Sequence, residues 1–234
     1  MFKIQVVKAD SSLTRLFSTA NLENFTENGK KIIGIAANYK SLLKVLNRGN
    51  PDNPPIFLKP STSYINEGNK IIIPKGFSVN QEIELGVIIG KKGKKIAVRD
   101  AMDFVGGYTV ALDMTATDQM AKIKAVGGSW TLAKGFDTAC PVSKFIPKEK
   151  IPNPHNVNIW CTVNGKEVQK GNTNDLFFKI PELVSYLSKY FTLEPNDLII
   201  TGSPPGMSPV TKGDAIEGGI KDVVSIKFEV DEEK

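Results

Sequence analysis

The sequence predicts a β-rich, mixed α+β fold with a few short helices. Short apolar segments recur along the chain and are separated by clusters of glycine, proline and asparagine, a pattern typical of strands joined by turns. Strands and helices do not alternate regularly, which argues against a doubly wound parallel sheet. With 234 residues, of which 41% are hydrophobic and 24% charged, the chain is long enough to bury a substantial core.

The expected strands follow one another over most of the chain. Apolar and β-branched residues dominate the segments 32–37, 56–59, 71–74, 81–90, 105–114, 157–163, 197–202 and 223–230. Asn164 and Gly165 follow one of these strands and predict a two-residue hairpin turn, because both residue types accept a positive φ.

Short helices are expected over residues 38–47, 115–124 and 180–190. The last is amphipathic and has Pro181 in its first turn, where the missing N–H costs nothing. The first contains four apolar residues that we expect to be covered by the chain's own pocket, by a family-type partner or by an unrelated subunit, since exposing all of them would favour aggregation. These are Leu42, Leu43, Val45 and Leu46.

Composition argues against several classes of function. No apolar run approaches the about 20 residues of a membrane-spanning helix, so the chain is not predicted to span a membrane. The net charge is +5, but the one tight lysine cluster, residues 91–95, contains a glycine and is typical of a solvated hairpin tip, so no nucleic-acid partner is expected. Cys140 and Cys161 form no spaced pattern, which favours a reducing compartment. The single histidine, His155, lies in a proline-rich turn that is a poor place for catalysis.

The first 30 residues are weakly patterned and are predicted to form an N-terminal arm, followed by one domain over residues 31–234. Arg15 precedes a run of small residues and acidic residues are scarce, features typical of a mitochondrial targeting segment. The alternative is an uncleaved arm, because residues 2–7 alternate like a strand. We therefore expect a mitochondrial protein, with a cytoplasmic location as the alternative.

Glu82 and Glu84 are two carboxylates in an otherwise apolar segment. Alternate residues of a strand face the same side, so the two are expected on one face, about 6–7 Å apart along the chain. Two buried carboxylates repel each other and lose hydration unless a cation lies between them. Ligation by carboxylates favours Mg²⁺, Ca²⁺ or Mn²⁺ over zinc. The alternative is an edge strand whose glutamates face solvent.

Six short motifs follow one another along the chain. They are Asn38-Tyr39 and the segments 57–62, 82–86, 111–116, 130–137 and 201–204. Together they resemble the fumarylacetoacetate hydrolase family, most closely its small single-domain branch of acylpyruvases and oxaloacetate decarboxylases. The resemblance extends from about residue 31 to about residue 230. It implies a mixed β-sandwich and roll, usually dimeric, with a divalent metal held by three carboxylates.

The resemblance also assigns residue roles. It places Glu82, Glu84 and Asp113 on the family's metal-ligand positions, with Mg²⁺, or Mn²⁺ or Ca²⁺, as the implied cofactor. Three oxygen ligands leave coordination sites open for a 1,2-dicarbonyl substrate. Lys134 falls on the active-site lysine, a cation that stabilises a developing enolate. Its alternative role is a salt bridge to one of the three carboxylates. Thr201 falls on a position that holds the substrate carboxylate.

Several residues depart from the family pattern. Leu42 and Val45 occupy the positions of a histidine and a glutamate that activate water in family enzymes. Neither side chain transfers a proton, so the usual catalytic dyad is absent. Thr117 and Met120 likewise replace an arginine and a glutamine that face the substrate.

Two functions remain open, and the sequence does not decide whether the chain is an enzyme. We favour a degenerate, non-hydrolytic pseudoenzyme that retains the metal site and acts as a structural or partner-binding subunit, in a mitochondrial assembly. The alternative, supported by the intact carboxylates, is a Mg²⁺-dependent enzyme acting on oxaloacetate or an acylpyruvate-like 2-oxoacid as a tautomerase, decarboxylase or hydrolase. The expected partners are a second copy of the chain or a close paralogue, and a small 2-oxoacid if the chain is active.

Overall fold

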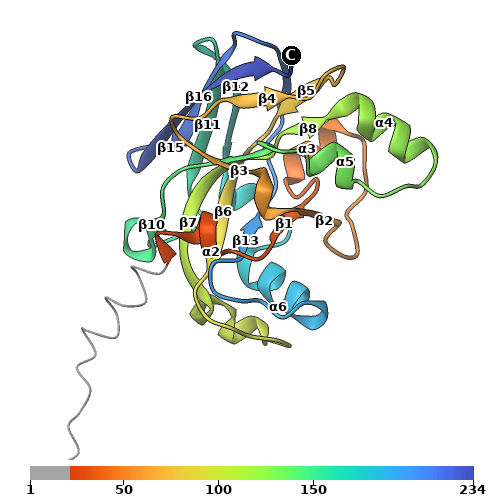
Figure 1. The fold of residues 1–234 in the computed structure, drawn as a ribbon. Helices are drawn as coiled ribbons and strands as arrows, with labels where there is room; N and C mark the ends of the chain where they lie inside the picture. The colour runs from red at the N-terminus through yellow and green to blue at the C-terminus, as the bar shows by residue number, and fades with distance from the viewer. Residues whose placement is uncertain (1–21) are drawn as a thin grey trace, which may run out of the picture.

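The computed structural model describes residues 22–234, and the predicted targeting features lie outside the described residues. Within the described range the chain forms three β-sheets with a few short helices around them (Figure 1). This architecture confirms the predicted β-rich, mixed α+β fold. No helix of residues 22–234 is long and apolar enough to cross a membrane.

The largest sheet carries the site that is described below. Its main path runs β2-β1-β13-β6-β7-β9-β3, and β10 pairs with β7 at its side. The bounds are β1 (Ile32–Ile35), β2 (Ile56–Lys59), β3 (Tyr64–Asn66), β6 (Ile83–Ile89), β7 (Val105–Leu112), β9 (Cys140–Val142), β10 (Ile146–Pro147) and β13 (Leu198–Ile200).

Two smaller sheets and the helices complete the described chain. One sheet is ordered β12 (Lys166–Asn172), β11 (Asn158–Val163), β15 (Ala215–Ile220), β16 (Val224–Glu232) and β4 (Ile71–Ile73), and the other is ordered β14 (Ser208–Val210), β5 (Val79–Gln81) and β8 (Thr115–Ala116). The α-helices are α2 (Phe25–Asn28), α3 (Lys40–Val45), α4 (Thr117–Ala125), α5 (Thr131–Lys134) and α6 (Ile180–Tyr190). The 3-10 helices are η1 (Ser61–Ser63), η2 (Val98–Asp103), η3 (Lys148–Lys150) and η4 (Thr173–Asp175).

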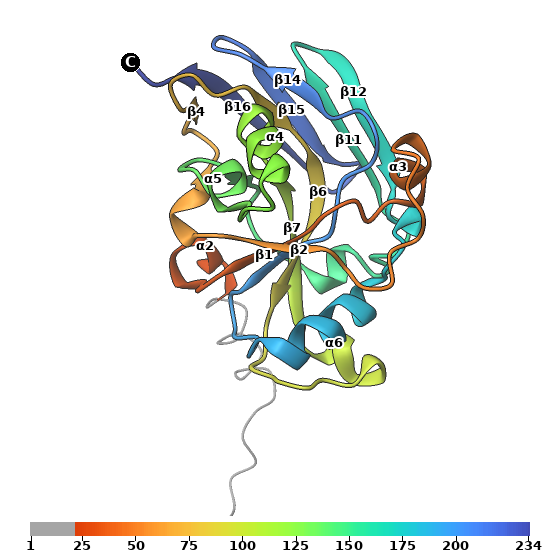
Figure 2. The same cartoon turned by 90° about the vertical axis from the view of Figure 1, so that its right-hand side faces the viewer.

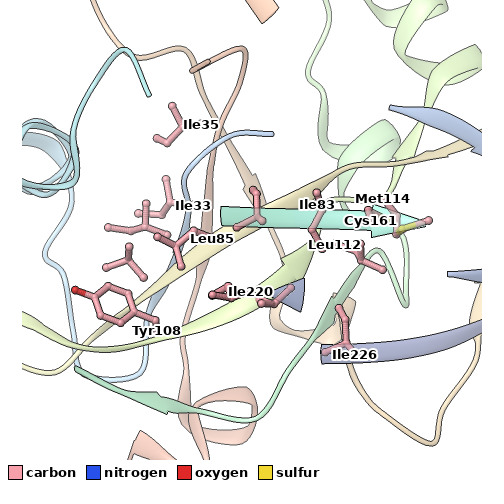
Figure 3. Close-up of a cluster of buried hydrophobic side chains, with 14 of the residues drawn as sticks. Ile33, Ile35, Ile83, Leu85, Tyr108, Leu112, Met114, Cys161, Ile220 and Ile226 are labelled. Carbon is pink, nitrogen blue, oxygen red and sulfur yellow. The ribbon is translucent and has the colours of Figure 1, made fainter. Parts of the chain in front are cut away.

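The main core lies where the five-stranded sheet packs against the largest sheet. Figure 3 shows Ile83 and Leu85 of β6 and Leu112 of β7 together with Cys161 of β11 and Ile226 of β16. All seven residues of β6 are buried, and β6 is hydrogen-bonded on both sides, to β13 and to β7. Burying an isoleucine or leucine contributes about 1.5–3 kcal/mol, which explains the nearly continuous apolar sequence of this strand.

Several predicted boundaries move by a few residues for local reasons. Asn164 and Gly165 form the predicted turn, with φ of 51° and 77°. The strand predicted over 32–37 ends at Ile35, and Ala37 has a φ of 51°, a left-handed conformation that does not continue a strand. The helix predicted over 115–124 begins at Thr117, because the two preceding residues pair with β5 as β8.

Two apolar segments pack differently from the sequence prediction. Leu42 and Leu43 of α3 are buried as expected, but Val45 is 70% exposed and Leu46 40% exposed, so the chain's own fold covers only the first pair and burial of the second pair by a partner stays a prediction. A six-residue helix packed on one face leaves its other face in solvent. The described end of the predicted arm packs onto the largest sheet through Leu22 and Phe25.

Candidate active site

Three carboxylates, which we call the carboxylate triad, meet at one end of the largest sheet. Glu82 directly precedes β6, Glu84 lies within it, and Asp113 follows the neighbouring strand β7. The backbone N–H of Asp113 donates to the carbonyl of Glu82 (2.8 Å), which fixes the two residues side by side. One carboxylate oxygen from each residue lies within 4.8 Å of the others. Because β6 is an inner strand and Glu84 is 1% exposed, the solvent-facing edge-strand alternative is wrong.

Hydrogen bonds from two neighbouring segments orient the two glutamates. Glu82 accepts from the Thr115 hydroxyl at Oε1 (2.7 Å) and from the Ser203 hydroxyl at Oε2 (3.0 Å). Glu84 accepts from the backbone N–H of Gly202 at Oε2 (2.5 Å). Residues far apart in the chain therefore hold the carboxylates in one arrangement.

Lys134, the last residue of α5, contacts the carboxylate triad directly. Its ammonium donates to Asp113 Oδ2, to Glu82 Oε1 (3.2 Å) and to the Thr115 hydroxyl (2.6 Å). The salt bridge expected as its alternative role is therefore present. The same side chain also lines the cavity above the carboxylates.

Lys59 is a site residue for which the sequence analysis predicted no role. It lies in β2, is fully buried, and its Nζ is 2.8 Å from Asp113 Oδ1. The sequence feature that could have indicated this role is a lysine at the end of an apolar strand, inside the motif 57–62. Strands at a sheet edge often carry solvated lysines, so this signal alone does not predict a buried contact.

One oxygen of the carboxylate triad lacks a hydrogen bond. The Lys59 ammonium has three protons and donates them to the carbonyls of Met114 (3.1 Å), Lys134 and Ala139 (2.9 Å). Asp113 Oδ1 is buried and accepts no hydrogen bond, although Lys59 Nζ is close. The Lys59 ammonium compensates the charge of this buried oxygen through an ion pair. Three converging carboxylates against two ammonium groups leave one negative charge uncompensated, and this set of oxygen donors fits a divalent cation.

The buried charges shift one another's pKa values. Burial, together with the charges of Asp113 and Glu82, raises the pKa of Glu84 well above its usual range. Burial alone would raise the pKa of Asp113, but the charges of Lys134 and Lys59 outweigh it and lower that pKa. Burial likewise opposes the charge on Lys134, but Asp113 and Glu82 outweigh it and raise the lysine's pKa. At neutral pH the lysine of the metal-free site is therefore an ammonium.

A cavity of about 370 Å³ opens above the carboxylate triad. Figure 2 shows α3 and α4 on opposite sides of the upper end of β6, and both helices contribute to the lining, through Leu42 and Met120. Thr117 also lines the cavity, so three of the positions that depart from the family pattern face it. Val45 does not line it.

Two other residues considered in the sequence analysis lie outside the cavity lining. Thr201 is buried and its hydroxyl donates to the carbonyl of Leu85 (2.9 Å), so here it ties the end of β13 to β6. Its predicted contact with a substrate carboxylate stays a prediction. His155 is half-buried and its Nε2 accepts from the N–H of Ile180 (3.3 Å), at the start of α6.

The fold and the site define a class of strand-rich protein that has a cavity at one end of its largest sheet. Three carboxylates that could hold a cation line this cavity. The sequence profile described as Fumarylacetoacetate (FAA) hydrolase C-terminal matches residues 31–231. The chain therefore belongs to the fumarylacetoacetate hydrolase family, as the six motifs indicated.

Relatives with known names are enzymes. The chain is 46% identical to "Oxaloacetate tautomerase FAHD1, mitochondrial" of Mus musculus, over 91% of this chain and 97% of that protein. It is 47% identical to "Oxaloacetate decarboxylase, mitochondrial" of Dictyostelium discoideum, over 85% and 92%. The fold matches the crystal structure of fumarylpyruvate hydrolase from Pseudomonas aeruginosa in complex with Mn²⁺ and pyruvate, with a TM-score of 0.81, 28% identity, and coverage of 88% and 91%.

These comparisons correct the favoured functional prediction. A degenerate pseudoenzyme serving as a structural subunit is wrong, because relatives that span nearly the whole chain are named as oxaloacetate tautomerases and decarboxylases. The groups missing at Leu42 and Val45 serve water activation, whereas the carboxylate triad and Lys134 are in place. The named relatives are mitochondrial, in agreement with the predicted location.

Proposed function

We propose that the chain is a divalent-metal-dependent tautomerase that interconverts the enol and keto forms of a 2-oxoacid of the oxaloacetate type. The observation that carries the proposal is the combination of an intact carboxylate triad, Lys134 in direct contact with it, and apolar residues at positions 42 and 45. Tautomerisation needs carbonyl polarisation and a proton donor, but no activated water. The names of the relatives support the substrate class.

Glu82, Glu84 and Asp113 would hold the cation, with Mg²⁺ or Mn²⁺ as the candidates for an all-oxygen donor set. A bound cation supplies Lewis-acid polarisation of the 2-oxo oxygen and attracts the adjacent carboxylate. The hydrogen bonds from Thr115 and Ser203 keep Glu82 oriented, so the site is organised before substrate arrives.

Lys134 carries the proton in this proposal. In the enol-to-keto direction its ammonium donates a proton to C3, and a C–H bond forms as the C2–C3 double bond becomes a C2–O double bond. The enol hydroxyl then returns its proton to Nζ. The sum transfers one proton from oxygen to carbon and leaves the lysine unchanged.

An absorbance assay on enol oxaloacetate tests the proposal. The full-length chain is stripped with a chelator and reloaded with Mg²⁺ or Mn²⁺, and pyruvate is measured in parallel. We expect loss of the enol band to be accelerated only by the metal-loaded protein, and pyruvate to appear more slowly. Pyruvate formed as fast as the enol disappears would identify a decarboxylase instead, and no acceleration would contradict the proposal.

We further propose a mitochondrial homodimer, or a dimer with a close paralogue. The support is the named location of the relatives and the dimeric assembly implied by the family resemblance. Light scattering over a dilution series should give twice the mass of one chain, or the mass of a mixed pair when a paralogue is added. The mass of a single chain at every concentration, alone or mixed, would contradict the pairing.

A further inference from the structure

We propose that the 2-oxoacid preferred by this chain carries an apolar substituent, aryl or branched alkyl, on C3, at the position where oxaloacetate carries its second carboxylate. The inference rests on the proposed function and specifies the substrate class of the same site. It follows from how polar and apolar side chains are distributed around the cavity.

The polar groups are concentrated at one end of the cavity. The carboxylate triad, Lys134 and the Thr115 hydroxyl lie together there and contact one another. This end accounts for the 2-oxo and carboxylate groups, which every 2-oxoacid shares. The groups that distinguish one 2-oxoacid from another must therefore contact the remaining walls.

The remaining walls are mostly apolar. Leu42 of α3 and Met120 of α4 approach the cavity from its two sides and are themselves only 4% and 8% exposed. Trp130, Ile35, Leu46 and Met207 extend the same surface, which we call the apolar wall. At about 370 Å³ the cavity is within the roughly 300–1,000 Å³ typical of small-molecule sites and has room for a ring beside the oxoacid group.

A second carboxylate against the apolar wall would lose water without gaining a hydrogen bond, which is unfavourable. An apolar substituent would instead remove both its own surface and the wall from water. Thr117 adds a single hydroxyl at this wall, too little to replace the hydration of a carboxylate.

Two cations at the cavity offer the competing explanation. Arg48 and Lys124 also line it, and within residues 22–234 neither has an ion-pair partner. Both are exposed, and the Lys124 ammonium lies 5.6 Å from the centre of the Trp130 ring. Exposed cations attract a carboxylate only weakly because water and salt screen them. The experiment must therefore compare an apolar substituent with a carboxylate directly.

Calorimetric titration of the Mn²⁺-loaded full-length chain makes this comparison with three unreactive 2-oxoacid analogues. Oxamate has no substituent, N-phenyloxamate has an apolar one, and N-oxalylglycine has a second carboxylate. We expect N-phenyloxamate to bind about tenfold or more tightly than either of the others, the usual effect of filling an apolar pocket. Tightest binding of N-oxalylglycine, weakened by Lys124→Gln or Arg48→Gln, would overturn the proposal.

Met120→Gln tests whether the apolar wall is responsible. The substitution nearly conserves volume, and we expect it to reduce the preference for N-phenyloxamate over oxamate by about tenfold. Met102→Gln is the matched control, because Met102 is half-buried in η2 and does not line the cavity. An equal loss of preference in both variants, or none in either, would contradict a role for the wall. Thermal unfolding of each variant verifies that it is folded.

Turnover separates this inference from the proposed function. We expect the metal-loaded chain to ketonise enol phenylpyruvate with a higher kcat/KM than enol oxaloacetate. Turnover of oxaloacetate without turnover of phenylpyruvate would overturn the inference and leave the proposed function standing. If neither enol is turned over and no analogue binds, the proposed function fails and the inference fails with it.

Discussion

Asp113 contacts both buried lysines, Lys59 through Oδ1 and Lys134 through Oδ2. With every group ionised, the carboxylate triad and the two lysines carry three negative and two positive charges, a net charge of −1 in a buried site. Burial is the largest cause of the raised pKa of Glu84, and the negative charges of Asp113 and Glu82 raise it further. A divalent cation would change the net charge of the ionised site from −1 to +1. It would therefore stabilise the ionised form of Glu84.

Glu84→Gln should weaken metal binding and stabilise the metal-free protein. Between the pKa of Glu84 in the unfolded chain and its raised pKa in the fold, the folded protein holds more protons, so the unfolding free energy falls as pH rises. A neutral glutamine removes this effect, and we expect the metal-free protein to gain about 0.5–2 kcal/mol at neutral pH. Thermal unfolding and Mn²⁺ titration measure the two effects. Retained Mn²⁺ affinity would contradict the ligand assignment.

Lys134→Met should separate chemistry from metal binding. The variant keeps the three carboxylates, so Mn²⁺ affinity should be retained or increased, since a competing cation has been removed. Tautomerase activity should fall about 10²–10⁴-fold, the usual contribution of a positioned proton donor. Lys122→Met is the control, because Lys122 is an exposed lysine of α4. Loss of Mn²⁺ binding would mean that the lysine organises the site rather than transferring the proton.

At the scale of elements, we expect α3 to determine whether the site can activate water. Its Leu42 faces the cavity, and Val45 lies one turn further along in solvent. Leu42→His with Val45→Glu should raise the rate of acylpyruvate hydrolysis. The upper limit of the increase is the contribution of a general base, about 10²–10⁴-fold. Acetylpyruvate cleavage measures the change, and Leu42→Asn with Val45→Gln is a polar control without a base. Comparable hydrolysis by the unmodified chain would show that another group activates water.

Some elements were predictable from local sequence and others were not. β2 and α6 have the predicted bounds, because apolar periodicity and Pro181 are local signals. The four-residue helix α5 was not predicted, although it positions Lys134. A helix this short has little stability of its own and forms through its contacts with β2 and β8.

The candidate site shows the same division. Glu82 and Glu84 were identifiable because carboxylates in an apolar strand are unusual, and the family motif added Asp113. The contact of Lys59 with Asp113 could not be predicted from the sequence, because it joins residues that are distant along the chain. The pseudoenzyme prediction failed because the missing dyad was taken as the loss of all catalysis rather than the loss of hydrolysis.

At the scale of the whole molecule, the cation should stabilise the fold. A ligand that binds only the folded chain adds about 2.7 kcal/mol to the unfolding free energy at one hundred times its Kd. We expect Mn²⁺ to raise Tm and a chelator to reverse the rise, as followed by circular dichroism. Glu84→Gln is the matched control and should not respond to Mn²⁺. Equal Mn²⁺ responses of both proteins would indicate binding elsewhere.

Hydrogen exchange at C3 of oxaloacetate, followed by NMR in D₂O, tests the central claim most directly. In the proposed mechanism Lys134 donates its proton from one side of the site, so the metal-loaded chain should accelerate exchange of one C3 hydrogen ahead of any loss of the C4 carboxylate. Chelation or Lys134→Met should return exchange to the buffer rate. Exchange at the buffer rate with Mg²⁺ or Mn²⁺ present, or pyruvate formed without prior exchange, would contradict a tautomerase.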